Sequence, residues 1–293
     1  MGENKQEWDR LLFILPFLAI VPYLYSTGES STDYWWLIIA APLLFFATIA
    51  IVGQVWNGHE FWVNRLKEGG VLGLGALSVS LSASIWLIYD YLDAHGHIES
   101  GDPFSLLTFD VLTYDSEGWS IASSGFSGIG LGIYLDAVSI MLLFVATFLC
   151  FLICWFAIGY MTTDSINDNS NHRFFAEFVL FSMGMFGMVL ADNFLWLFIF
   201  WEIMGLCSYL LIGFYYEKPS AAYAAKKAFL TTRVGDVFLM IGLVMMWDLF
   251  GSLDYAVVFD EANIAAVAAE SSGTLQWALG MMFIGAVGKS AQF

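Results

Sequence analysis

The sequence predicts an all-α, polytopic transmembrane helix bundle of about eight spans. The first observation is composition: 59% of the 293 residues are hydrophobic and only 13% are charged, values outside the usual range of soluble domains. The second is a series of apolar runs, most of them near the ~20 residues that a helix needs to cross ~30 Å of hydrocarbon. The third is that Lys and Arg residues fall in every second loop.

The first apolar run is short and contains Pro16 and Pro22. Because Lys5 and Arg10 precede it, a cleaved signal peptide is a competing interpretation, although no small-x-small cleavage site follows cleanly. In chain order, the runs are 11–25, 36–56, 71–92, 134–160, 174–191, 194–214, 229–250 and 275–293.

The loops 26–35, 93–133 and 251–274 contain no Lys or Arg. Since basic loops remain in the cytoplasm, the amino terminus is predicted to be cytoplasmic and these three loops external. Lys289 is the exception, because it falls well inside a span and outside the cytoplasmic set, whereas Arg233 lies at the cytoplasmic start of its span.

Three regions are expected along the chain. Residues 1–92 form an amino-terminal three-helix region, and residues 93–133 form an acidic external loop. Residues 134–293 hold five closely spaced spans and most of the intramembrane ionisable residues, so we expect them to be the mechanistic unit. Within them, residues 254–270 are predicted to form a short surface helix.

The external loops are strongly acidic, and the net charge of the chain is −17. Such a surface repels nucleic acid and attracts cations, so no nucleic-acid partner is expected. A face that concentrates cations and an adaptation to a salty habitat both explain it. Cys150, Cys154 and Cys207 have no metal-ligand spacing, and no phosphate loop follows a strand. We therefore expect no cofactor and no metal site on this chain.

Charged residues inside the spans are the candidate functional residues. Glu202 lies near the middle of its run, where a carboxylate must be neutral or paired. A protonated structural acid is the alternative. Burying the ammonium of Lys289 costs at least ~2.5–3.5 kcal/mol, which favours a functional role. Arg233 and Asp236 are three residues apart on one helix face, a spacing that indicates an ion pair or a helix end fixed in depth.

An acid on one span and a lysine on another are the components of a proton relay. Attraction to a carboxylate stabilises the ammonium, whereas desolvation opposes it. A Glu202–Lys289 pair that is made and broken would therefore switch the lysine between holding and releasing a proton. Glycines 280, 285 and 288 are predicted to let neighbouring helices approach closely around this site.

Four ordered motifs resemble the antiporter-like membrane subunits of respiratory complex I. The resemblance is strong over residues 131–293, and Leu135-Asp-Ala-Val-Ser139 also fits the family. The motifs are Ala191-Asp-Asn-Phe-Leu-Trp-Leu-Phe-Ile-Phe-Trp-Glu202 with its continuation to Tyr216, Lys227-Ala-Phe, Thr232-Arg-Val-Gly-Asp236 and Gly288-Lys-Ser-Ala-Gln292.

The resemblance implies a role for each candidate. Glu202 corresponds to the family's pumping glutamate and Lys289 to the lysine of its broken seventh helix. Arg233 and Asp236 correspond to the charged pair that tunes this lysine, and Lys227 to a further lysine near the cytoplasmic end.

The implied function is that of a proton-translocating subunit of a complex I-type quinone oxidoreductase in a prokaryotic cell membrane. Quinone, iron–sulfur clusters and flavin are expected on partner subunits. The expected partners of this chain are other membrane subunits, the lipid bilayer and protons, with sodium as the alternative ion.

Two departures from the family pattern are expected. Residues 36–56 correspond to the family's first helix, so 11–25 would be an additional one. The family also continues beyond the last motif into a second, inverted half-channel, so this chain is expected to hold one half-channel only. Two alternatives stay open: the large subunit of a multisubunit cation/proton antiporter, and a non-conducting membrane anchor.

Overall fold

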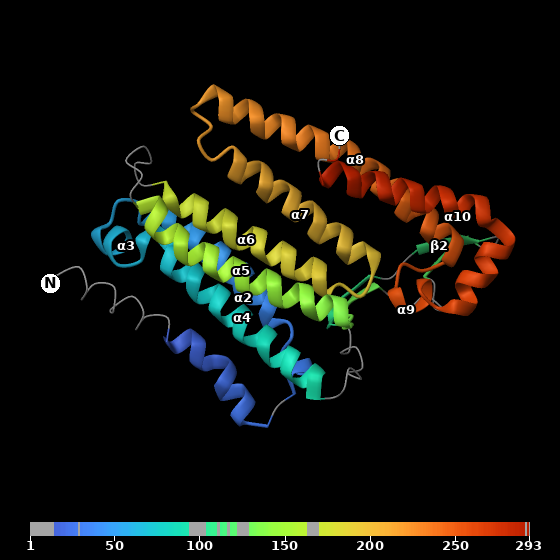
Figure 1. The fold of residues 1–293 in the computed structure, drawn as a ribbon, viewed down its shortest axis with the longest axis horizontal. Coiled ribbons are helices and arrows are strands. Elements are labelled where there is room, and N and C mark those ends of the chain that lie inside the picture. The colour runs from blue at the N-terminus through green and yellow to red at the C-terminus, as the bar shows by residue number, and fades with distance from the viewer. Residues whose placement is uncertain are drawn as a thin grey trace.

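The computed structural model describes residues 15–28, 30–93, 104–109, 112–115, 118–121, 129–162, 170–290 and 292. Most of these residues lie in helices, which form an elongated bundle (Figure 1). An apolar helix, Leu15–Ser26, comes first. The helices that follow are η1 (Ser31–Asp33), α2 (Leu37–Val55), α3 (Glu60–Asn64), η2 (Lys67–Gly69), α4 (Gly70–Asp93), α5 (Ala137–Thr162), α6 (Asn171–Leu190), α7 (Phe194–Ile212), α8 (Pro219–Phe250), α9 (Tyr255–Val258) and α10 (Glu261–Lys289).

The predicted helix bundle is confirmed. In the described part of the chain, six helices are long and apolar enough to cross a membrane: α4 together with η2, α2 together with η1, α5, α6, α7 and α8. The predicted first run is represented by the shorter helix Leu15–Ser26, since the residues before Leu15 lie outside the described part. The eighth run corresponds to the second part of α10, which bends at Ser271, where the backbone leaves helical geometry (φ −139°, ψ 41°).

This bend also bears on the short surface helix predicted at 254–270. The region forms two helices, α9 and the first part of α10, instead of one. Asp260 separates them and caps α10, because its side chain accepts hydrogen bonds from the backbone N–H groups of Ala262 and Asn263. An Asp at the N-cap satisfies donors that have no partner within the helix, so the helix begins here.

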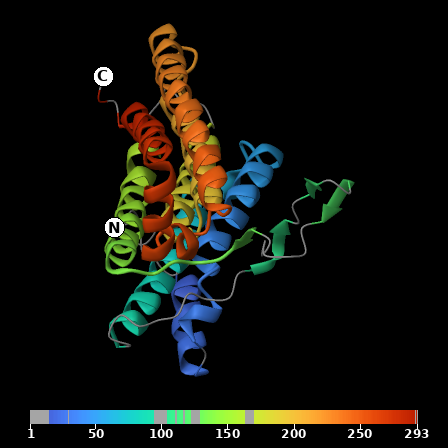
Figure 2. The same ribbon diagram turned by 90° about the vertical axis from the view of Figure 1, so that its right-hand side faces the viewer.

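The loop 93–133 contains strands that the all-α prediction did not include. Its described residues form two antiparallel pairs, which extend to one side of the bundle (Figure 2). Strand β1 (Phe104–Phe109) pairs with β4 (Ile129–Leu131), and β2 (Leu112–Asp115) pairs with β3 (Gly118–Ile121).

The connections of the bundle alternate between its two ends, as the basic residues predict. The helix α3 and the α7–α8 connection lie at one end, whereas β2 and α9 lie at the other (Figure 1). The basic Lys218, Lys226 and Lys227 therefore lie at the end opposite the acidic segments.

Close packing between α8 and α10 depends on glycine. A Cβ atom at Gly235 would lie 3.2 Å from both the Gly285 carbonyl oxygen and the Gly288 Cα atom. The prediction of close approach is thus confirmed for Gly285 and Gly288. It is wrong for Gly280, where a Cβ would meet nothing within 4 Å. Gly280 is exposed on α10.

Candidate functional site

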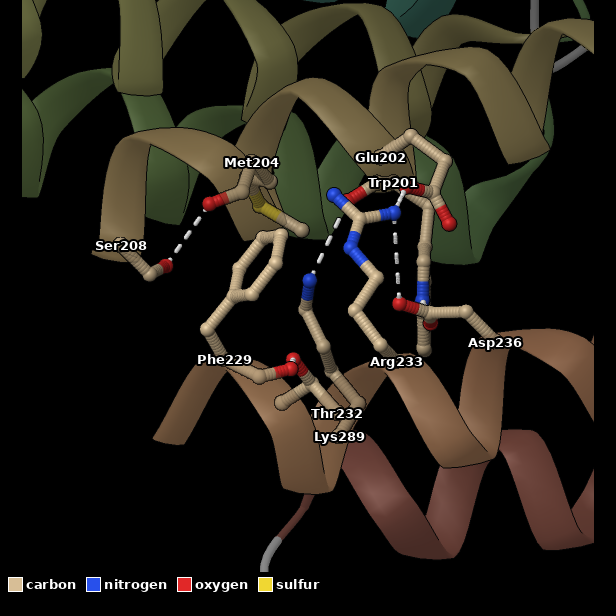
Figure 3. Close-up of polar contacts among 9 residues, drawn as sticks. All are labelled: Trp201, Glu202, Met204, Ser208, Phe229, Thr232, Arg233, Asp236 and Lys289. Atoms are coloured by element: carbon tan, nitrogen blue, oxygen red, sulfur yellow. Dashed lines mark hydrogen bonds and ion pairs between the residues drawn. The ribbon is translucent and has the colours of Figure 1, made fainter. Parts of the chain in front are cut away.

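Three helices bring four of the predicted charged residues together. Glu202 comes from α7, Arg233 and Asp236 from α8, and Lys289 from the end of α10 (Figure 3). Arg233 and Asp236 meet because residues three apart share a helix face. Lys289 reaches the same place because the glycines of α10 allow this helix to pack directly along α8.

Arg233 lies between the two carboxylates. Its Nη1 forms an ion pair with Glu202 Oε2 and lies 3.7 Å from Asp236 Oδ2. The guanidinium also lies 4.7 Å from the centroid of the Phe229 ring. The predicted Arg233–Asp236 pair is therefore present, but Arg233 is closer to Glu202. The guanidinium has five donors in a planar fork, which suits it to serve two carboxylates at once.

Lys289 does not contact Glu202 in this arrangement. Its Nζ donates a hydrogen bond of 3.1 Å to the Trp201 carbonyl oxygen and lies 5.2 Å from the centroid of the Trp201 ring. Among the described residues, no ion pair joins it to a carboxylate. The expected direct pair is absent from this structure because Arg233 occupies the carboxylate of Glu202.

Asp236 is the most deeply buried of the four, with 4% of its surface exposed. Its Oδ1 accepts a 2.8 Å hydrogen bond from Trp201 Nε1, whereas its buried Oδ2 has no hydrogen-bond partner. A buried carboxylate needs nearby donors or a cation to offset its desolvation. Trp201 and Arg233 supply them.

Sequence reasoning missed Trp201 and Gly205, which flank Glu202 on α7. They are four residues apart and so share one helix face. A Cβ at Gly205 would lie 3.0 Å from Lys289 Nζ, so this glycine makes room for the ammonium. A lone glycine within an apolar helix was the signal for Gly205. Trp201 gave no comparable signal among 12 tryptophans.

A cavity of about 600 Å³ opens between α7, α8 and α10, with Lys227 and Lys289 both in its wall. The hydroxyl groups of Ser208, Thr231 and Thr232 also line it. Each of them donates to a backbone carbonyl of its own helix. Their free lone pairs can therefore accept hydrogen bonds from water or an ammonium group.

The cavity joins a surface lysine to the buried charges. Lys227 is exposed near the amino-terminal part of α8, whereas Lys289 is partly buried beside Gly205. All five predicted site residues thus belong to one region: four in the charged cluster and Lys227 across the cavity. Their functional roles stay predictions.

Two family models match the chain. One, described as "NADH:quinone oxidoreductase/Mrp antiporter, TM", matches residues 191–293 and so covers the whole candidate site. The other, "NADH-Ubiquinone oxidoreductase (complex I), chain 5 N-terminus", matches residues 119–175. The chain belongs to the family of antiporter-like membrane subunits that these two models describe. The family resemblance seen in the motifs is confirmed, and the chain is a multi-pass membrane protein.

Curated relatives agree with this assignment. NADH-quinone oxidoreductase subunit L of Escherichia coli is 35% identical over 256 residues, which are 87% of this chain and 37% of the relative. F(420)H(2) dehydrogenase subunit L of Methanosarcina mazei is 41% identical over 203 residues, 64% of this chain and 30% of the relative. The chain therefore spans well under half the length of these relatives.

Two solved structures share the fold of this antiporter-like chain. A chain of an archaeal membrane-bound sulfane sulfur reductase aligns with a TM-score of 0.60 at 18% identity, covering 87% of this chain and 44% of that one. A chain of the Mrp complex from Dietzia aligns with a TM-score of 0.57 at 16% identity, covering 86% and 23%. Both belong to multisubunit membrane complexes.

Proposed function

We propose that this chain carries a proton half-channel in a membrane subunit of a complex I-type quinone oxidoreductase. One observation carries the proposal: Lys289 lines a cavity of about 600 Å³ and lies beside a network of the buried Asp236 and the partly buried Arg233 and Glu202. A lysine in such a place can load and release protons, because its charged form depends on both hydration and nearby counter-charge.

The geometry suggests how the counter-charge could change. Arg233 pairs with Glu202 and has Asp236 only 3.7 Å away. A small shift of the guanidinium toward Asp236 would free Glu202. The freed carboxylate would then attract the Lys289 ammonium and favour proton loading from the cavity. Return of Arg233 to Glu202 would remove that attraction and favour release.

Electron transfer belongs to other subunits in this proposal. Quinone, flavin and iron–sulfur clusters would bind to partner chains, and this chain would supply proton translocation. The electron donor stays open, because the relatives are named for NADH, NAD(P)H and F(420)H(2).

The test is Lys289→Arg in the assembled complex, reconstituted into proteoliposomes and supplied with electron donor and quinone. A guanidinium keeps its proton at physiological pH, so proton translocation through this half-channel should stop although the positive charge remains. Lys226→Arg is the matched control, because Lys226 is exposed on α8 and does not line the cavity. Wild-type proton translocation by the Lys289→Arg complex would refute the proposal.

A cation/proton antiporter is the second candidate. The matching family model covers Mrp antiporters as well, and a chain of the Mrp complex shares the fold. Sodium-driven proton movement without any electron donor would favour the antiporter. Proton movement that requires donor and quinone would favour the oxidoreductase.

We further propose that the amino terminus and the α7–α8 connection face the cytoplasm. The three native cysteines are buried, so a thiol reagent should label an introduced surface cysteine with little background labelling. Both Ser220 and Ala268 are exposed, at opposite ends of the bundle. An impermeant thiol reagent added outside intact cells should label Ala268→Cys but not Ser220→Cys, and the reverse pattern would invert the orientation.

A further inference from the structure

Trp201 connects the buried carboxylate of Asp236 to the lysine of the cavity. Its indole N–H donates to Asp236 Oδ1 at 2.8 Å, and its backbone carbonyl accepts from Lys289 Nζ at 3.1 Å. The centroid of its ring lies 5.2 Å from the same Nζ. Figure 3 shows Trp201 among the charged side chains, next to Glu202 on α7.

The indole N–H takes one of the acceptor positions of Asp236, a carboxylate that attracts Lys289 electrostatically. Asp236 Oδ1 is taken by the indole, and Oδ2 faces Arg233. Hydrogen bonds between two ionised groups are roughly twice as strong as neutral ones, so a free Asp236 would compete for the ammonium. The indole N–H reduces that competition.

Lys289 is held instead by neutral groups. A carbonyl dipole and an aromatic face attract an ammonium, but less strongly than a carboxylate in the same poorly hydrated place. Since Lys289 also lines the cavity, a loosely held ammonium there can pass its proton to water. An ammonium fixed in a buried salt bridge would keep it.

We propose that Trp201 is a positioning residue that keeps Lys289 off the Asp236 carboxylate, so that the lysine can release its proton into the cavity. This inference rests on the proposed function, because it takes Lys289 as the proton carrier. The competing role is simple packing of α7 against α8. The two roles differ in what the indole N–H does, since packing depends on the ring alone.

The decisive variant is Trp201→Phe, which keeps an aromatic ring and the backbone carbonyl but removes the N–H. The matched control is Trp196→Phe on the same helix, because Trp196 is buried and packs against the Phe200 ring. Both variants remove one indole from α7, so a loss of packing alone should affect them alike.

The measurement is donor-driven proton translocation by the reconstituted complex over a pH series. In Trp201→Phe the uncapped Asp236 should hold the ammonium more tightly, so release should need a higher pH. We expect the acidic limb of the pH profile to move upward by about one unit, the equivalent of about tenfold tighter proton binding. Trp196→Phe should leave the profile in place. Among the described residues, the charged or titratable groups near Lys289 are Cys207 on α7 and Arg233 and Asp236 on α8, and Glu202 pairs with Arg233. Tyr209 and Lys227 line the same cavity as Lys289.

Asp236→Asn provides a second test. Its pH profile can be measured even if the single Trp201 variant does not assemble. Without the carboxylate, the acidic limb should move downward, and adding Trp201→Phe should produce no upward shift. An unmoved limb in Asp236→Asn, or an upward shift that persists in the double variant, would overturn the positioning role.

The outcomes also separate this inference from the proposed function. If Lys289→Arg abolishes translocation but Trp201→Phe leaves both rate and pH profile unchanged, Trp201 is only a packing residue and the function stands. Slower translocation with an unmoved profile, or the same shift in Trp196→Phe, leads to the same conclusion. Wild-type translocation in Lys289→Arg would instead remove the proton carrier itself.

Discussion

The two halves of the bundle solve the problem of polar groups in a membrane differently. In the half built from α2, α4, α5 and α6, neutral hydroxyls link the middle parts of the spans, the acids Glu68 and Glu177 lie near helix starts, and 72% of the most apolar window of the α4 span is buried. In the half built from α7, α8 and α10, charged side chains meet beside a cavity, and only 22% of the α7 window is buried. The first half holds the most deeply buried span and is called the support, whereas the second half holds the charged cluster and the cavity.

Hydroxyl groups in the support form hydrogen bonds between neighbouring spans. Ser80 donates to the Ile38 carbonyl oxygen at 2.9 Å, and the hydroxyls of Ser84 and Thr147 are 2.9 Å apart, linking α4 to α2 and α5. These groups have no charge to exchange. In the charged half, one cation lies between two carboxylates, because Arg233 pairs with Glu202 and also has Asp236 Oδ2 3.7 Å away. A cation shared between two acids permits more than one arrangement.

Removal of the Glu202 carboxylate, which pairs with Arg233, should have the largest effect on proton translocation. Glu202→Gln would release Arg233 to Asp236 and leave no carboxylate to recruit Lys289. We expect proton translocation to fall by about a hundredfold, the scale of a lost acid–base group. Assembly should be retained because the shape of the side chain is conserved. Measurement of translocation and of complex content in the same membranes tests both points.

Glu202→Asp is the graded control for this prediction. It keeps the charge but shortens the reach to Arg233, so part of the translocation should remain. Equal loss in the Asp and Gln variants would show that the position of the carboxylate matters more than its charge.

A smaller, partial effect is expected from the Arg233–Asp236 pair. Asp236→Asn should reduce translocation severalfold, on the order of the 0.5–3 kcal/mol coupling found between contacting residues. Removal of both charges together, with Arg233→Gln, should cost less than the sum of the single losses. Arg233→Gln alone leaves both Glu202 and Asp236 without their cation, and Asp236→Asn removes one of these two uncompensated charges. A double-mutant cycle on translocation rate measures this coupling. Strictly additive losses would show that the two residues act independently.

A still smaller effect should follow from Gly205→Ala. The added Cβ would lie 3.0 Å from Lys289 Nζ, at the end of a flexible side chain that can move aside. We expect translocation to fall about twofold to threefold, because a displaced ammonium loses its contact with the Trp201 carbonyl. Gly159→Ala is the matched control, since a Cβ there meets nothing within 4 Å. Comparable losses in both variants would assign the effect to the helix backbone.

The spans and the charged residues of the site could be predicted from the sequence. The partners of these residues could not, for physical reasons. Span positions followed from the length of apolar runs, and Glu202, Arg233, Asp236 and Lys289 stood out because charge is costly in hydrocarbon. Their partners could not be read from spacing. Arg233 and Glu202 lie on different helices, so their pairing depends on how α7 and α8 pack. The strands of the loop 93–133 were missed because they lie outside the apolar runs of helical length from which the spans were predicted.

The role of Trp201 could not be predicted from the sequence either. Its indole and carbonyl act on Lys289 and Asp236 from two other helices, and neither contact has a signature along the chain. Gly205 was more accessible, since glycine inside an apolar helix often marks the close approach of another group. Here that group is an ammonium, which only the packed structure reveals.

The smallest functional effect is expected in the support half. Ser84→Ala combined with Thr147→Val removes both members of a buried hydroxyl pair and leaves no orphaned donor between α4 and α5. Loss of one interhelical hydrogen bond of this kind averages about 0.6 kcal/mol in membranes. The double variant should therefore lower the thermal stability of the complex slightly and leave its proton translocation unchanged. Ser84→Ala alone should destabilise at least as much, because it leaves Thr147 with one partner fewer. If the double variant instead slowed translocation as strongly as Asp236→Asn, the division into a passive support and a functional half would be wrong, and the hydroxyl pair would have to be counted among the residues that control the proton path.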